Sequence, residues 1–301
     1  MKPLSHGAAV ALMVLTGLLW SSAGVTVRHI ERAEAFEQVF WRSLFAFAFV
    51  AAFLTITGKG AGPAARAAGW PGMLSGSMWA VMYTAFLVAL ALTTTANTLV
   101  VMSVSPLITA VLARVVLSEP VTMRTWVAAA CAMIGIGWMF GFSVEEPRHL
   151  AGMLVALLIP IAAAVNVVTL RASRARLDLI PAVMIGGALS SLIALPFALP
   201  FSATWRDIAL LAFLGFFQLG LPCMLLVVVS RSLPAPEIAL LALLEVVLGP
   251  LWAWLGAGET PTRATLIGGV LVLAALAANE LAALGVRGQG RNYSGGAKLS
   301  E

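Results

Sequence analysis

Charged side chains are scarce in this sequence. Only 10% of its 301 residues are Asp, Glu, Lys or Arg, whereas soluble domains of ordinary composition carry about a quarter. Apolar residues make up 61% of the chain. A soluble core cannot hide that much apolar surface, but a lipid bilayer can, so the composition indicates an integral membrane protein.

Cysteine and histidine are almost absent. The two cysteines, Cys131 and Cys223, lie inside apolar runs, where buried thiols usually pack as small hydrophobic side chains. The three histidines, His6, His29 and His149, lie outside these runs. No helix carries a His-x-x-x-His pair or a related zinc motif, so we expect no metal site and no cofactor.

Other absences weaken whole classes of function. The lysines and arginines form no basic run interleaved with aromatic residues, which argues against a nucleic-acid partner. The sequence shows no adjacent carboxylate pair, no histidine within a helix and no nucleophile–base pair. We therefore predict that the protein is not an enzyme, with an integral membrane enzyme kept as the weaker alternative. The short loops leave no room for the soluble domain of a receptor.

Long apolar runs fill most of the chain, and a membrane-spanning helix needs about 20 mostly apolar residues. The sequence predicts an all-α integral membrane protein with ten transmembrane helices. They are placed at residues 7–26, 38–57, 70–91, 95–116, 123–142, 150–170, 179–200, 205–229, 236–257 and 263–284. Lys2 followed by an apolar run and Ser21-Ser22-Ala23 also resembles a cleavable signal peptide, an alternative that would remove the first helix.

The basic residues suggest an orientation. With the N-terminus in the cytoplasm, most of the 18 lysines and arginines fall on the cytoplasmic side, including the cluster Arg171, Arg174 and Arg176. Most acidic residues then fall outside. We expect a multi-pass protein with both termini in the cytoplasm. The tail at 287–301 is polar and rich in Gly and Ser, so we expect it to be disordered.

An internal repeat divides the chain. A constant offset of 140 residues aligns Glu119 with Glu259 and Thr122 with Thr262, each pair between an apolar helix and a helix of small residues. A weaker match aligns WSSAGVTVRH with AAVNVVTLRA. The repeat predicts a first unit at 1–145 and a second at 146–286. Because each unit holds five helices, the second enters the membrane inverted, as is typical of secondary transporters with a binding site near the midplane.

Several short motifs carry a family resemblance. Leu-Leu-Trp-Ser closes the first predicted helix and Phe-Trp-Arg (Phe40–Arg42) opens the second. Ser-Pro (Ser105-Pro106) lies in the fourth, and Ser-Glu-Pro (Ser118–Pro120) follows it. In order and spacing, over residues 5 to 285, these motifs resemble the drug/metabolite transporter superfamily of EamA type.

The ninth predicted helix departs from that family pattern. Members often carry Glu-Pro there, whereas this chain has Glu245-Val246 and a later proline at Pro250. The exact kink of this helix therefore does not follow from the resemblance.

The resemblance implies export of small metabolites, often amino acids or drugs, by alternating access across the bacterial inner membrane. Our leading hypothesis is a secondary transporter of amino acids or related amphipathic compounds. The alternative is a proton-coupled multidrug exporter of the same fold. The expected partners are a small-molecule substrate and membrane lipid, with protons as the candidate coupling ion. We expect a monomer.

Two charged residues are candidates for binding such a solute. Glu245 lies in the middle of an apolar helix, where a charge costs at least ~2.5–3.5 kcal/mol, so it must face a cavity, find a partner or stay protonated. It would bind a substrate ammonium group or a proton, or it is a structural carboxyl bonded to a neighbouring helix. Arg42 has the planar fork that suits a substrate carboxylate, but it could instead extend to the interface beside Trp41.

The other candidates are aromatic or amide side chains. Trp79, Tyr83 and Phe86 share one helix face, which either lines a cavity or serves as packing. Intramembrane amides need hydrogen-bond partners or water, so they too are candidates for lining the pathway. The complete predicted substrate site comprises Trp20, Arg42, Trp79, Tyr83, Asn97, Asn166, Gln218 and Glu245.

Overall fold

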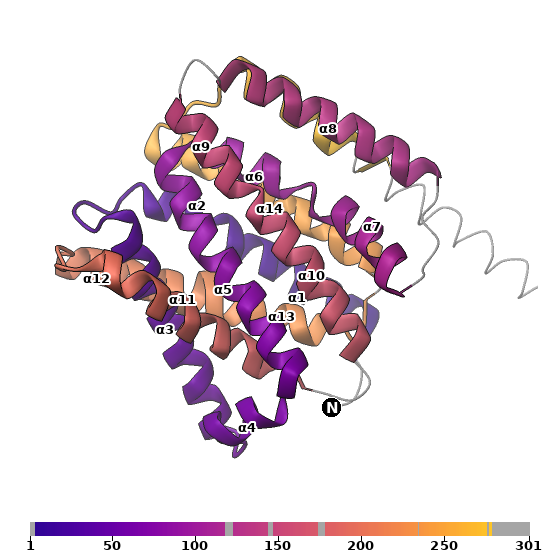
Figure 1. The fold of residues 1–301 in the computed structure, drawn as a ribbon. Helices are drawn as coiled ribbons and strands as arrows, with labels where there is room; N and C mark the ends of the chain where they lie inside the picture. The colour runs from indigo at the N-terminus through magenta and orange to yellow at the C-terminus, as the bar shows by residue number, and fades with distance from the viewer. Residues whose placement is uncertain are drawn as a thin grey trace, which may run out of the picture.

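The computed structural model describes residues 4–117, 123–143, 147–173, 178–233, 235–275 and 277–278. These residues form helices joined by short connections, and no strand occurs among them. Figure 1 shows α5 and α10 running alongside each other through the bundle, and the two helices pack together. The Glu119–Thr122 half of the repeat match and the predicted tail lie outside the described residues.

The helices of the first part of the chain extend to Ser143. They are α1 (His6–Ser21), α2 (Ala23–Val27), α3 (Ala35–Ile56), α4 (Ala61–Ala67), α5 (Gly69–Leu92), α6 (Thr95–Met102), α7 (Ser105–Leu117) and α8 (Met123–Ser143). The later helices are α9 (Pro147–Ala156), α10 (Leu158–Ser173), α11 (Ile180–Ala198), α12 (Trp205–Phe213), the π-helix η1 (Leu214–Gly220), α13 (Leu221–Val229), α14 (Ala235–Ala257) and a final helix, Arg263–Ala275.

Seven helices among the described residues are long and apolar enough to cross a membrane. They are His6–Val27, Ala35–Ile56, Gly69–Leu92, Thr95–Val116, Pro147–Leu170, Ile180–Ala198 and Trp205–Val229. Three apolar helices are shorter, namely Trp126–Gly135, Leu244–Ala257 and Arg263–Ala275. The all-helical prediction is confirmed, and the count of ten spans stays a prediction. The short helix α4 was not predicted.

Side-chain caps explain where several helices begin. Thr94 has extended backbone angles and its hydroxyl accepts a hydrogen bond from the Asn97 N–H, so α6 starts directly after the tight turn at Thr93. At α12, Thr204 and Asp207 form a reciprocal capping box. Each cap satisfies backbone groups that a helix end would otherwise leave unpaired.

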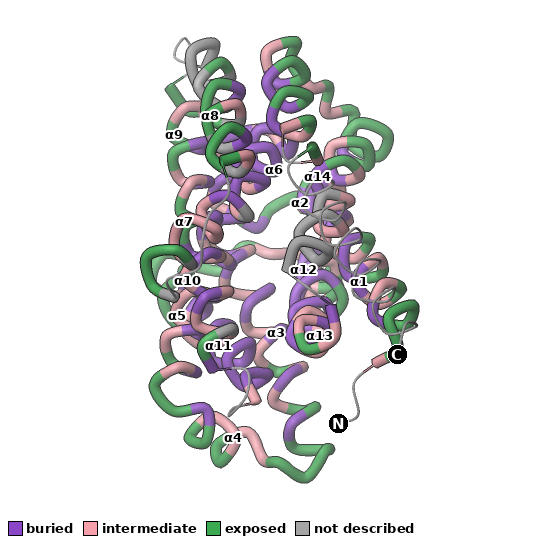
Figure 2. Tube along the Cα trace, turned by 90° about the vertical axis from the view of Figure 1, so that its right-hand side faces the viewer, coloured by how far each residue is buried: buried purple, intermediate pink, exposed green. Residues whose placement is uncertain are grey.

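The distribution of side chains is that of a membrane protein. Among the most exposed residues are the large apolar side chains Trp205 at 89% and Ile56 at 84%. Figure 2 shows exposed positions on the outward turns of the helices and buried ones turned inward. The interior, by contrast, holds charged side chains such as Glu37 and Arg42. Apolar surface facing outward at this scale is stable when the surrounding solvent is lipid.

The helices pack in two groups that α3 and α11 hold together. The first group is α5, α6, α7, α9 and α10, and the second is α1, α2, α13 and α14. Helices α3 and α11 pack extensively on each other, α11 also packs on α5, and α3 packs on η1. Gly187 permits the close α3–α11 approach, because a Cβ there would lie 2.9 Å from the Ser43 carbonyl oxygen.

Helix α8 and the final helix lie together along one edge of the bundle, where Figure 1 draws the final helix in yellow behind α8. A Cβ on Gly135 of α8 would lie 2.9 Å from the Gly268 carbonyl oxygen, so this glycine allows the two backbones to approach closely.

Candidate functional site

Arg42 lies in the interior, with 1% of its surface exposed. Because α3 begins at Ala35, Arg42 lies about two turns inside the helix, one turn deeper than the sequence suggested. Its Nη2 donates to the Tyr83 carbonyl oxygen (2.6 Å) and its Nη1 to the Gln218 Oε1 (3.3 Å). The guanidinium carbon is 5.6 Å from the centre of the Phe86 ring. The alternative in which Arg42 extends to the interface is therefore wrong.

Three polar atoms around Arg42 are buried without a hydrogen-bond partner. They are Arg42 Nε, Trp79 Nε1 and Tyr83 Oη. The Trp79 and Tyr83 ring centres are 5.5 Å apart, and Tyr83 also receives the Arg42 bond at its carbonyl. Leaving such a group unsatisfied costs about 1–3 kcal/mol, and native structures rarely do so. The three atoms are therefore candidate hydrogen-bond donors for a solute.

Cys223 of α13 completes the group, and sequence reasoning missed it. The residue is 1% exposed and packs in one cluster with Trp79 and Tyr83, while Trp20 of α1 packs against that cluster. A thiol in an apolar run gave no signal of this placement. We name the Arg42 cluster by its members, which are Trp20, Arg42, Trp79, Tyr83, Gln218 and Cys223.

Glu245 is half-buried in α14. Neighbouring Leu244 packs on α1, where a Cβ added to Gly17 would lie 3.4 Å from the Leu244 Cβ. Within the described ranges, no hydrogen bond or ion pair joins the Glu245 carboxylate to another residue. The Arg42 guanidinium is not its partner, because it binds Tyr83 and Gln218. The alternative in which Glu245 is a structural carboxyl bonded to a neighbouring helix is therefore not supported by any bond among the described residues.

The two asparagines of the predicted site have partners. Asn166 accepts a hydrogen bond from the Ser75 hydroxyl (2.6 Å), which joins α10 to α5 one turn before Trp79. Asn97 donates to the Thr93 hydroxyl (3.0 Å) and accepts from the Thr265 hydroxyl (2.7 Å). Asn97 therefore belongs to a network that joins α6 to the final helix, apart from the Arg42 cluster.

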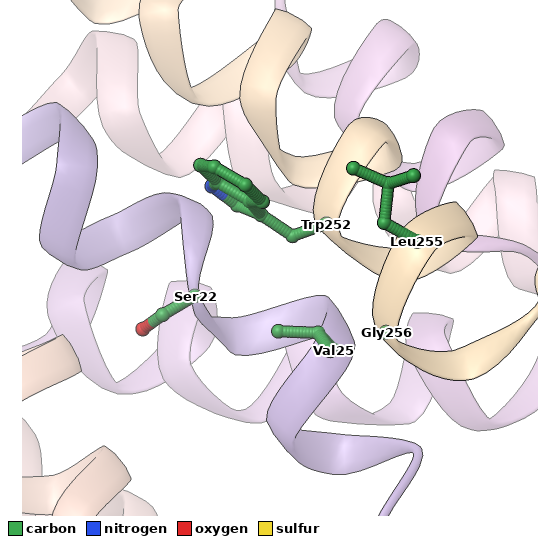
Figure 3. A pocket seen from close by; sticks show the side chains of 5 residues that line it. All are labelled: Ser22, Val25, Trp252, Leu255 and Gly256. Carbon is green, nitrogen blue, oxygen red and sulfur yellow. The ribbon is translucent and has the colours of Figure 1, made fainter.

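A shallow apolar hollow lies elsewhere, between α2 and α14. Figure 3 shows its lining, which consists of Ser22, Val25, Trp252, Leu255 and Gly256. The Trp252 indole N–H donates to the Ser21 hydroxyl, 3.1 Å away. None of the lining residues belongs to the Arg42 cluster, and none is charged, so the hollow lacks groups that would orient a polar solute.

The described residues contain no group of three His, Cys, Asp or Glu side chains that could hold a metal ion.

The model of the EamA-like transporter family matches the chain twice, over residues 7–141 and 150–279. One solved crystal structure matches 92% of this chain and 98% of its own, with a TM-score of 0.66 and 19% identity. At that identity the likeness concerns the fold alone. No curated protein gives a significant sequence match.

Proposed function

Because the chain belongs to the EamA-like transporter family, within the drug/metabolite transporter superfamily, we propose that it exports amino acids or closely related amphipathic metabolites by alternating access. It is a multi-pass membrane protein, and transporters of this family are generally not enzymes. One observation carries the proposal. The interior holds a buried arginine beside unpaired hydrogen-bond donors, and Glu245, whose carboxylate has no described partner, lies half-buried in α14.

The donor side of the site suits a carboxylate. Arg42 supplies the positive charge, and its Nε is not used by the protein. Tyr83 Oη and Trp79 Nε1 are two further unused donors beside it. A carboxylate accepts several hydrogen bonds and forms stronger ones with charged donors, so it would satisfy all three groups at once.

The acceptor side suits an ammonium group. Glu245 has no described partner and is half-buried, so a substrate cation can replace the missing counter-charge. A zwitterion would use Arg42 and Glu245 together. The multidrug alternative rests on Glu245 alone, exchanging a proton for a cationic drug. The buried charge of Arg42 disfavours a cation at the same site, which favours the amino-acid reading.

The helix packing supports the inverted repeat, with units at 1–145 and 146–286. If each helix is exchanged for its counterpart in the other unit, the α3–α11 contact maps onto itself. The α5–α11 contact then maps onto α3–η1, and the α7–α10 contact onto α1–α14. This pattern is what a pseudo-two-fold axis would produce. Cytoplasmic termini, the bacterial inner membrane, a monomeric state and proton coupling belong to the same proposal.

Uptake into liposomes tests the function. The panel contains zwitterionic amino acids, their amides without a carboxylate, their N-acetyl forms without an ammonium, and cationic drugs, each with and without a proton gradient. We expect transport of the zwitterions, with both modified series failing to compete. Transport of cationic drugs that amino acids do not inhibit would establish the multidrug alternative instead.

A further inference from the structure

An ion pair lies where α5 ends and α6 begins. Arg28 directly follows α2 and Glu259 follows α14, so both belong to the second helix group. The Arg28 Nε lies 2.7 Å from the Glu259 Oε2. The two residues are 231 positions apart in sequence, and their side chains meet at the surface, where that of Arg28 is 30% exposed and that of Glu259 is 14% exposed.

Both members of the pair also bind the first helix group. Arg28 donates from Nη1 to the Leu90 carbonyl oxygen (2.9 Å) and from Nη2 to the Thr93 carbonyl oxygen (3.0 Å), at the end of α5. Glu259 accepts from the Thr95 hydroxyl (3.0 Å) and from the Thr95 N–H, at the start of α6. The cation thus faces a helix C-terminus and the anion a helix N-terminus, the arrangement that the helix dipoles favour.

The two helix groups are in direct contact at this end. Helix α14 packs on α6, where a Cβ on Gly249 would lie 2.3 Å from the Leu99 Cδ1. Toward the other end of α14, no comparable packing joins it to α7 in the residues that the structure describes. The groups are therefore fastened together at the end that carries Arg28 and Glu259.

We propose that Arg28 and Glu259 form the gate that closes this end of the transport passage. The inference rests on the proposed function, because alternating access requires the two helix groups to separate at each end in turn. Separation here breaks every bond from Arg28 and Glu259 to Leu90, Thr93 and Thr95, while the ion pair itself travels with the second group. Arg28 and Glu259 are positioning residues, acting on access to the site and not on the solute.

Cys223 provides a native reporter for the gate. With Cys131 replaced by serine, Cys223 is the only thiol, and it lies in the Arg42 cluster. A small membrane-impermeant methanethiosulfonate is added from each side of oriented vesicles, and the labelling rate is measured. Arg28→Ala and Glu259→Gln should raise the rate from one side about tenfold, because lost charge-assisted bonds shift the closed state toward the open one.

The matched control is the exposed pair Arg206–Glu31, with side chains 61% and 54% exposed. Arg206→Ala should leave the labelling rate unchanged, since exposed pairs contribute little. Labelling needs no transported solute, so this result is independent of the uptake assays. Gate variants that elute as intact protein and label at the wild-type rate from both sides would overturn the gate.

A charge swap separates the gate from an ordinary ion pair. Arg28→Glu with Glu259→Arg keeps opposite charges but sets a carboxylate against the Leu90 and Thr93 carbonyls and a guanidinium against the Thr95 N–H. We expect the swapped protein to label as fast as the single variants. A swap that restores the wild-type rate would refute the role of the backbone contacts.

Discussion

Two polar regions of the protein, the Arg28–Glu259 pair and the Arg42 cluster, differ in how their groups are paired. Around Glu259, the guanidinium of Arg28 and both carboxylate oxygens have partners on the neighbouring helices. In the Arg42 cluster, three buried polar atoms have none. A fully satisfied network fixes one arrangement of helices, whereas unsatisfied groups retain the capacity to bind. Pairing therefore distinguishes the proposed gate from the proposed substrate site.

The largest effect on transport is expected from a substitution of Arg42. Arg42→Lys keeps the charge but loses the planar fork that reaches Tyr83 and Gln218 together. We expect kcat/KM for uptake to fall about 100-fold, the size expected for losing charged hydrogen bonds. The exposed Arg206 supplies the control, Arg206→Lys, which should transport normally. Wild-type uptake by Arg42→Lys would remove Arg42 from the substrate site.

Glu245→Gln tests the acceptor side of the site. The substitution keeps the shape and removes the charge, and no described hydrogen bond is lost with it. We expect normal insertion and thermal stability, with substrate affinity lowered about tenfold or the proton dependence abolished. Stability and uptake are measured on the same sample. Normal stability together with unchanged uptake and pH profile would show that Glu245 is merely structural.

Tyr83→Phe and Thr95→Val compare an unpaired hydroxyl with a paired one. The Tyr83 hydroxyl has no protein partner, so its loss should leave the unfolding free energy unchanged within about 0.5 kcal/mol and weaken substrate binding about fivefold. The Thr95 hydroxyl binds Glu259, so Thr95→Val should lower the unfolding free energy by about 1 kcal/mol. Thermal denaturation in detergent measures the change in unfolding free energy of both variants. Equal destabilisation by the two variants would contradict the distinction.

Apolar runs predicted most of the helices, because lipid imposes a length and a composition on a spanning segment. The short helix α4 was not predicted from the sequence, because it is not a membrane-spanning segment. The two helix groups were not predicted either, because they depend on contacts between the repeats, such as that of α5 with α10.

The sequence predicted some residues of the candidate site and missed others. The periodicity of α5 placed Trp79 and Tyr83 on one face, and both are buried there. Arg42 was ambiguous, because a long side chain near a helix start can reach the interface or turn inward. Tertiary packing decides it, since a Cβ on Gly215 would lie 2.7 Å from the Arg42 carbonyl oxygen and η1 brings Gln218 beside α3. Cys223 and the Arg28–Glu259 pair gave no local signal.

The smallest effect is expected at a third polar cluster, whose paired side chains are more exposed than Arg28 and Glu259. Asp178 binds Lys59 (2.6 Å) and Arg231 (3.2 Å), and its side chain is 34% exposed. Burial alone would raise the pKa of Asp178, but the Lys59 and Ile180 hydrogen bonds and the Lys59 and Arg231 charges outweigh it and hold this pKa below the ordinary 3.8. The cluster's contribution is therefore complete above pH 3.8 and lost as the pH falls through the lower folded value.

Asp178→Asn removes this charge and makes the stability of the cluster independent of pH. We expect it to lower the unfolding free energy at neutral pH by at most about 1 kcal/mol, because solvent screens exposed pairs. The difference from wild type should shrink as the pH is lowered below 3.8 and with added salt. Thermal denaturation of both proteins across that pH range measures it. A larger loss, unaffected by salt, would mean that this end is fastened as firmly as the Glu259 end, and pairing alone would no longer distinguish the proposed gate.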